Sequence, residues 1–255
     1  MDIIAETSMW GNREENKMDQ LNANKAVVLS SGGLDSTTAL AKTVAALGKD
    51  HVLALSFFYG QRHDKELVSS QKVADYYGVK HITLNLEGVM QFSNASLLSH
   101  STQSIEETSY ADQVAASENG KVATYVPYRN GLFLSAAASM AMSLCEDPKD
   151  RALVVIGNHA DDYAGNAYAD CSPEFIEAIK KSIELGTYGQ VSVYSPFRFS
   201  SKKDIVKEGL ALEVPYQLTW SCYQGGDQPC HLCGTCRDRE EAFAANGVVD
   251  PLNAD

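Results

Sequence analysis

Positive charge is scarce in this sequence. The 255 residues contain 33 Asp and Glu against 21 Lys and Arg, so the formal net charge at neutral pH is −12. Proteins that bind nucleic acid or an anionic membrane surface electrostatically use clusters of Lys and Arg. The composition therefore argues against both kinds of partner.

Long apolar runs and a targeting signal are also missing. No apolar run approaches the roughly 18–20 residues of a spanning helix, and no basic segment followed by an apolar run opens the chain. We expect a protein of the cytoplasm with no membrane partner. The hydrophobic content of 44% is enough to fill a core, which excludes wholesale disorder.

Cysteine is too rare for a disulfide-built scaffold, yet four of the six cysteines cluster near the C-terminus. They form the pattern C-x₇-C-x₂-C-x₂-C, made by Cys222, Cys230, Cys233 and Cys236. Gaps of two residues let thiolates converge, and four thiolates suit a structural Zn²⁺. An iron–sulfur cluster, disulfides and a redox pair are the alternatives, but the fourth cysteine lies upstream and no C-x₃-C-P follows. The pattern favours zinc, with His231 as a bystander.

Strand-like and helix-like segments alternate along the chain. The strand candidates are Lys25–Ser30, Val52–Tyr59, Val79–Leu84 and Ala152–Ile156, and the helix candidates are Thr37–Leu47, His63–Tyr77, Gly131–Cys145, a segment beginning at Pro173, and Lys202–Leu212. This alternation predicts an α/β fold, doubly wound, with a mostly parallel sheet and helices on both faces.

The composition also predicts where the parts of the chain begin and end. We expect a flexible extension over residues 1–24, a nucleotide-binding α/β domain over 25–212, and a small zinc-binding segment over 213–255. The stretch 91–121 is rich in Ser, Thr, Asn and Glu and exceeds an ordinary connection, so it is either a functional lid or a mobile insertion.

A glycine-rich turn, Ser31–Ser36 (SGGLDS), stands between the first predicted strand and helix. Such a turn lets the backbone approach an anion, and the following helix directs free N–H groups at it. The hydroxyls of Ser31 and Ser36 add donors, while Asp35 suits Mg²⁺ or orients the loop. The alternative is a plain turn capped by Asp35 or Ser36. No Lys follows the glycines, which excludes the G-x-x-x-x-G-K-[ST] loop.

The loop resembles the PP-loop of the N-type ATP pyrophosphatase superfamily, which implies ATP and an adenine nucleotide alpha hydrolase-like fold. The nucleotide-binding residues that this resemblance implies are Ser30, Ser31, Gly32, Gly33, Leu34, Asp35, Ser36, Thr37, Thr38, Ala39 and Leu40.

Three further polar segments follow predicted strands or precede a helix: Tyr59–His63 (YGQRH), Val126–Asn130 (VPYRN) and Gly157–Phe175. Together with SGGLDS, a nearby Glu66 and the terminal SCYQGG…CHLCGTCRDREEAF, they resemble the 7-cyano-7-deazaguanine synthase family in order and over almost the whole chain. The resemblance implies an ATP-dependent ligase of queuosine biosynthesis. It would convert 7-carboxy-7-deazaguanine and ammonia to the nitrile through an amide, as a homodimer.

The same resemblance assigns roles to particular residues. Asp35, Ser36 and Arg129 are expected to be catalytic, and the substrate-binding residues are expected to be Arg62, Arg129, Asn130 and Asp170. Two positions depart from the family pattern, because Tyr128 replaces the usual glycine of V-P-G-R-N and Ala169 the usual proline of Y-P-D-C. These departures leave open whether the reaction stops at the amide. Whether ATP yields ADP or AMP is open as well.

Two competing functions remain at this point. A PP-loop enzyme that modifies tRNA directly would need a basic stripe, which the sequence lacks. A zinc-bearing interaction module on an inactive nucleotide fold would not need an intact SGGLDS.

Overall fold

The computed structural model describes residues 22–117 and 121–253. The extension predicted for residues 1–24 therefore lies outside the described residues, apart from 22–24. None of the helices in the described ranges is both long enough and apolar enough to span a membrane.

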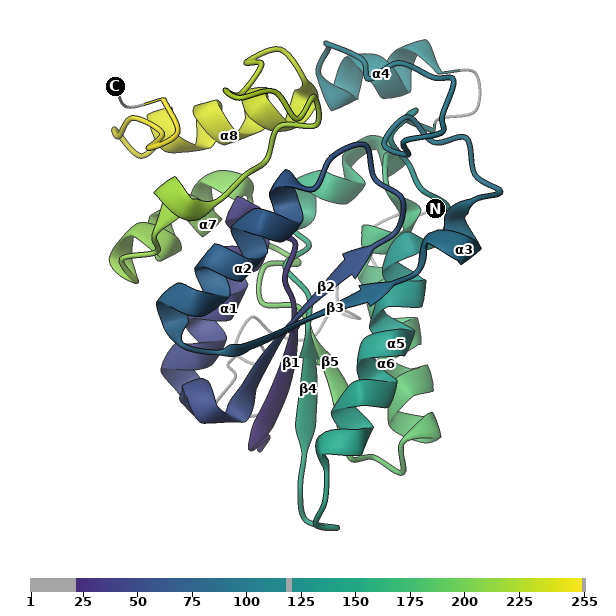
Figure 1. The fold of residues 1–255 in the computed structure, drawn as a ribbon, viewed down its shortest axis with the longest axis vertical. Coiled ribbons are helices and arrows are strands. Elements are labelled where there is room, and N and C mark those ends of the chain that lie inside the picture. Colours follow the sequence, from purple (N-terminus) through teal and green to yellow (C-terminus); the bar gives the residue numbers. More distant parts are fainter. Residues whose placement is uncertain (1–21, 118–120, 254–255) are drawn as a thin grey trace, which may run out of the picture.

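A five-stranded sheet forms the centre of the molecule (Figure 1), and its strand order is β3-β2-β1-β4-β5. The strands are β1 (Lys25–Leu29), β2 (Val52–Phe58), β3 (Lys80–Asn85), β4 (Ala152–Val155) and β5 (Val191–Tyr194). All neighbouring pairs run parallel. The apolar runs of β1 and β4 suit this position, since a central parallel strand is covered on both faces. The predicted parallel sheet is confirmed, and β5 is a strand that the sequence analysis missed.

Helices cover both faces of the sheet, as the doubly wound prediction requires. One face carries α1 (Leu34–Leu47), α2 (Lys65–Tyr77) and α7 (Lys202–Ala211), and α8 (Gly234–Ala244) packs on α7. The other face carries α5 (Arg129–Leu144) and α6 (Pro173–Gly186) (Figure 1). Alternate residues of β1 divide between the two layers: Val28 packs in a core cluster with Leu40, whereas Val27 packs in a cluster with Leu134.

The chain reverses its winding between β1 and β4. The helix after β1 lies on one face of the sheet, and the helix after β4 lies on the other. In open parallel sheets this arrangement leaves a crevice at the carboxyl ends of the two strands. The loop Ser30–Gly33 follows β1 and the segment Ile156–Ser172 follows β4, so the topology brings both to that crevice.

The described part of the 91–121 stretch packs against the rest of the molecule. It contains the short α4 (Tyr110–Ala116), and α3 (Glu87–Met90) precedes it. The backbone N–H of Ser99 donates to Gly60 O at 2.8 Å, and Leu98 is fully buried. Ile105 is buried against Trp220 and the cysteine cluster. The stretch therefore joins the end of β2 to the cysteine-bearing segment (Figure 1).

Candidate functional site

The glycine loop has a conformation that requires glycine. Gly32 has a φ of +77°, and a Cβ there would collide with the backbone oxygen of Glu66 and lie 2.5 Å from the backbone nitrogen of Ser70. Gly33 is the N-cap of α1, and no side chain caps that end. The first N–H groups of the helix are therefore available to an anion, and the plain capped turn considered from the sequence is not what forms here.

Two hydroxyl groups lie at the mouth of this loop. Ser31 Oγ and Ser36 Oγ are 3.0 Å apart, and the backbone N–H of Gly33 donates to Ser31 Oγ. Beneath them, Ser70 Oγ donates to Ser30 Oγ at 2.7 Å, and Ser56 Oγ donates to Ser30 O at 2.6 Å. Ser31 and Ser36 thus face the crevice, while Ser30 anchors the loop to the strand and helix below.

The later residues of the predicted nucleotide set lie deeper. Thr37, Thr38, Ala39 and Leu40 are fully buried and do not line the cavity described below. Thr38 Oγ1 donates to Leu34 O, and it also shares a hydrogen bond with the hydroxyl of Tyr216 at 2.8 Å. These residues hold α1 in place behind the loop.

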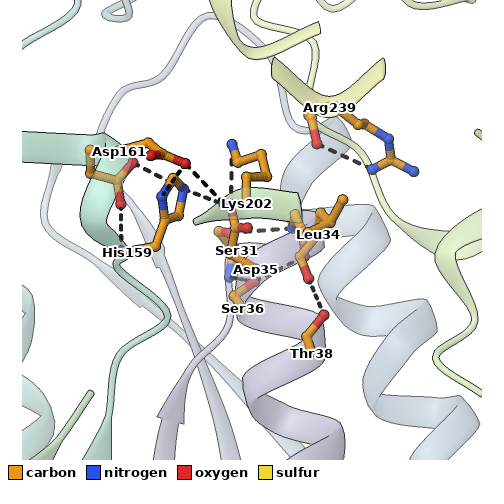
Figure 2. Close-up of polar contacts among 12 residues, drawn as sticks. Ser31, Leu34, Asp35, Ser36, Thr38, His159, Asp161, Lys202 and Arg239 are labelled. Atoms are coloured by element: carbon orange, nitrogen blue, oxygen red, sulfur yellow. Dashed lines mark hydrogen bonds and ion pairs between the residues drawn. The ribbon is translucent and has the colours of Figure 1, made fainter. Parts of the chain in front are cut away.

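An acidic cluster with two basic partners stands at one end of the crevice (Figure 2). The His159 ring is 2% exposed; its Nε2 lies 3.7 Å from Asp35 Oδ2 and 3.4 Å from Asp162 Oδ1, and its Nδ1 lies 3.7 Å from Asp161 Oδ2. Lys202 Nζ lies 3.6 Å from Asp35 Oδ2. Burial opposes the charge on Lys202, but the surrounding carboxylates outweigh it and raise the pKa of this ammonium.

The Asp35 side chain has an unused acceptor in this cluster. Its Oδ1 is buried, and none of the described residues gives it a hydrogen bond. Carboxylate oxygens are the protein ligands that Mg²⁺ prefers. Asp35 is therefore a candidate magnesium ligand beside the glycine loop, and Asp162 lies against the same His159 nitrogen.

The other end of the crevice combines a guanidinium with aromatic groups. Arg129 Nη1 donates to the Tyr59 hydroxyl at 3.3 Å, and its guanidinium lies over the Tyr59 ring at 5.5 Å. Burial opposes the charge on Arg129, but its interactions with Tyr59, Tyr223 and Asp170 outweigh it and raise its pKa. Burial also raises the pKa of Tyr59 to about 12. Arg129 therefore stays charged and Tyr59 stays neutral at physiological pH.

Asp170 lies below the start of α5 rather than in the open crevice. It is 4% exposed, and its Oδ2 accepts the backbone N–H of Asn130 at 2.8 Å. The Asn130 amide in turn donates to Cys171 Sγ at 3.1 Å. Tyr128, which lies just before α5, has a φ of +55°, the left-handed conformation that glycine adopts most readily. This explains why glycine stands there in the family pattern.

Arg62 holds the 91–121 stretch. Its Nε donates to Ser96 O, and its Nη2 donates to Gln103 O, with the side chain at the rim of the cavity.

One cavity of about 250 Å³ connects the two ends of the crevice. A single water needs only roughly 10–15 Å³ on this kind of measure, so there is room for a ligand of several rings. The wall at the glycine loop is made by Ser31, Gly33, Asp35, Ser36, Asp162 and Lys202. The other end of the crevice is lined by Tyr59, Arg129, Asn130 and Tyr223, whereas Glu66 and Trp220 line the cavity next to Gly32. Within the predicted set, the residues that the structure brings to this cavity are Ser30, Ser31, Gly33, Leu34, Asp35, Ser36, Arg62, Arg129 and Asn130.

The four predicted metal ligands converge at the start of α8. The sulfur atoms of Cys222, Cys230, Cys233 and Cys236 all lie within 4.8 Å of one another, and the sulfurs of Cys230 and Cys236 are 4.0 Å apart. Sulfurs on one tetrahedral zinc with Zn–S bonds of about 2.3 Å lie about 3.8 Å apart. All four cysteines are free rather than disulfide-bonded. The four sulfurs therefore fit one ion and leave no open ligand position.

The cysteine cluster is joined to the cavity by the preceding residues. The backbone N–H of Trp220 donates to Gly32 O at 2.9 Å, and its indole N–H donates to Cys222 O at 2.8 Å. A metal held by Cys222 thus fixes the segment that forms one wall of the cavity.

A glycine loop at the switch point of a doubly wound sheet, with carboxylates and a buried lysine beside it, defines an α/β enzyme of the PP-loop class. The match to known proteins is more specific. The chain belongs to the family described as queuosine biosynthesis protein QueC, whose model matches residues 25–247.

The relatives cover nearly the whole chain. It is 41% identical over 232 residues to a 7-cyano-7-deazaguanine synthase of Archaeoglobus fulgidus, and this alignment covers 91% of this chain and 90% of the relative. It is 39% identical over 238 residues to a 7-cyano-7-deazaguanine synthase of Oceanobacillus iheyensis, and this alignment covers 91% of this chain and 99% of the relative.

Proposed function

We propose that this protein is an ATP-dependent carbon–nitrogen ligase that converts 7-carboxy-7-deazaguanine and ammonia into 7-cyano-7-deazaguanine through an amide. The observation that carries the proposal is the single cavity that joins the phosphate-binding loop to Arg129. It allows a carboxylate held by the guanidinium to meet the phosphates of ATP. The names of the relatives supply the substrate class.

The glycine loop would hold the phosphates. Ser31, Ser36 and the first N–H groups of α1 supply the donors, and Asp35 with Asp162 would hold Mg²⁺. The ion, when bound, would offset the negative charge of the phosphates beside these carboxylates. Lys202, with its raised pKa, contributes a permanent positive charge at the same place.

The far wall would hold the substrate. The guanidinium of Arg129 offers a planar pair of donors that matches a carboxylate. Asn130 lies beside it, and Asp170 fixes both by holding the start of α5. The assignment of Asp170 to the guanine-like edge, and of Arg62 to substrate binding, stays a prediction. Arg62 would act through the 91–121 stretch that it holds.

The chemistry requires activation because a carboxylate oxygen is a poor leaving group. Transfer of a phosphoryl or adenylyl group from ATP makes it a good one, and donors fixed in the loop stabilise the charge that develops. Ammonia then gives the amide. A second ATP activates the amide oxygen, and its departure leaves the nitrile.

The cysteine cluster would hold Zn²⁺ in a structural role, since four thiolates complete the coordination of this ion. In this proposal the enzyme acts in the cytoplasm as a homodimer, and its substrate is a small molecule rather than a nucleic acid.

The test mixes purified protein, MgATP, ammonium and 7-carboxy-7-deazaguanine and follows the products by mass spectrometry. We expect the amide to appear first and the nitrile to replace it. Formation of neither product by protein loaded with zinc would refute the proposal.

A further inference from the structure

Glu66 has a carboxylate in the cavity that the account so far does not use. It lies in the first turn of α2, and its backbone oxygen lies directly against Gly32 of the glycine loop. Its side chain lines the same cavity as Ser31 and Arg129. Because Gly32 belongs to the phosphate-binding loop, Glu66 is placed near the point where the substrate carboxyl would be activated.

The Glu66 carboxylate is not held by a hydrogen bond or an ion pair to another described residue. Within the described ranges, no group donates to it and no cation forms an ion pair with it, although Arg129 interacts with it electrostatically. The nearby Lys65 is engaged elsewhere, since its ammonium lies 4.6 Å from the centre of the Trp220 ring and 3.7 Å from Asp227 Oδ1. The carboxylate lines the cavity and is only partly buried, so a ligand in the cavity can donate to it. A small donor that carries positive charge would match this carboxylate.

Arg129 and Glu66 line the same cavity with opposite charges, and these charges suit the two substrates. Arg129 is matched to the carboxylate of the organic acid, as argued above. The opposite charge, on Glu66, is matched to ammonium, the form in which most ammonia exists at neutral pH. Ammonium carries only N–H donors, which is what an unpartnered carboxylate can accept.

We propose that Glu66 binds the ammonium ion in this cavity and accepts its proton, so that ammonia is released next to the activated carboxyl carbon. This inference rests on the proposed function and assigns the second substrate a site within it.

The step is balanced as follows. The Glu66 carboxylate takes one proton from ammonium, and the nitrogen lone pair that this exposes forms the C–N bond. The bond between the acyl carbon and the activating phosphate oxygen breaks, and its electron pair leaves with the phosphate. A second proton passes from the nitrogen to solvent, which leaves the neutral amide and a protonated Glu66.

The surroundings of Glu66 suit this role. Burial raises its pKa to about 7, with Arg129 acting in the opposite direction. A base is most effective when its pKa is near the working pH. Tyr59 also interacts electrostatically with Glu66, and its raised pKa keeps it neutral. The kcat/KM for ammonium should therefore fall as the pH drops through about 7, because protonated Glu66 can accept no proton.

The experiment compares two nucleophiles in Glu66→Gln. Hydroxylamine is largely the free base at neutral pH and needs no proton removed before it attacks. With ammonium at pH 7 we expect the rate of amide formation to fall about 10²–10⁴-fold, the usual contribution of a positioned base. With hydroxylamine we expect hydroxamate formation to fall less than about tenfold, since the variant changes only the base. Glu66→Asp should restore part of the ammonium reaction.

Two controls accompany it. Asp75→Asn removes the same charge from an exposed position of the same helix and should leave both reactions unchanged. With ammonium, the rate of amide formation by Glu66→Gln should come closer to that of the unaltered protein at alkaline pH, where free ammonia becomes abundant. Circular dichroism and zinc content should match those of the unaltered protein.

Three results would overturn the inference. The first is an equal loss with both nucleophiles, which would make Glu66 a structural or acid-binding residue. The second is an unchanged ammonium reaction. The third is a loss of the ammonium reaction in Glu66→Gln that stays the same at every pH. By contrast, failure of the unaltered protein to form either amide or hydroxamate would refute the proposed function itself.

Discussion

The pair Arg239–Asp250 provides the most demanding test of how the C-terminal segment is held. Arg239 Nε donates to Asp250 Oδ2 at 2.6 Å and Nη2 donates to Oδ1 at 2.9 Å, a bidentate arrangement. The side chains are only 3% and 4% exposed. The same guanidinium donates to Thr219 Oγ1 at 2.7 Å and to Tyr216 O. It therefore braces the residues that lead to the cavity wall.

Replacement of Asp250 by Ala would leave this guanidinium buried without its counter-charge. Removing one partner of a buried ion pair costs about 3–5 kcal/mol. The other hydrogen bonds of Arg239 keep it from turning outward to water, so we expect a loss in that range. The measurement is denaturant-induced unfolding of the zinc-loaded protein. For each variant, the slope of the free energy of unfolding against denaturant concentration is compared with that of the unaltered protein.

The matched control is Glu208→Ala, which removes a carboxylate from the more accessible pair with Lys42, whose side chains are 30% and 38% exposed. An exposed pair contributes roughly 0–1 kcal/mol, so this variant should change the free energy of unfolding little. If Asp250→Ala cost no more than Glu208→Ala, the reasoning about buried charge in this segment would be wrong.

Three further predictions concern the cavity and the metal. Gly32→Ala should abolish product formation in the mass assay, because its Cβ would collide with α2 and displace the phosphate-binding loop; normal turnover would contradict this. Asp35→Ala should abolish turnover while circular dichroism and zinc content stay unchanged, and preserved activity would remove Asp35 from the site. Cys233→Ser should reduce the bound zinc measured by metal analysis and alter Trp220 fluorescence, since both belong to one buried cluster. An absorbing brown protein would instead indicate an iron–sulfur cluster.

Local patterns were sufficient for the core of the fold. The apolar run of β1, the following glycines and the helical spacing after them predicted a strand–loop–helix unit, because each depends only on residues close in the chain. Pro173 likewise predicted the start of α6, and the structure adds Ser172 as its N-cap. Strand β5 was not predicted, because a run of four residues, VSVY, is too short to show a clear periodicity.

Long-range convergence could not be predicted in the same way. Lys202 was predicted only as the first residue of a helix, yet the fold brings its ammonium to Asp35, far away in sequence. His159 gave no signal by itself, because a buried histidine among three carboxylates is recognisable only once the loops after β1 and β4 meet. Asp170 stays a predicted substrate-binding residue, and nothing in the sequence indicated that its carboxylate also accepts the backbone N–H of Asn130 at the start of α5.

The central claim is that ATP activates the carboxyl oxygen of the substrate at the glycine loop. It is tested most directly with 7-carboxy-7-deazaguanine labelled with ¹⁸O in both carboxyl oxygens. The account predicts that one label moves to a phosphate-containing product of ATP for each activation, so that complete conversion to the nitrile transfers both. Release of the label into water, with the phosphate-containing products unlabelled, would contradict it.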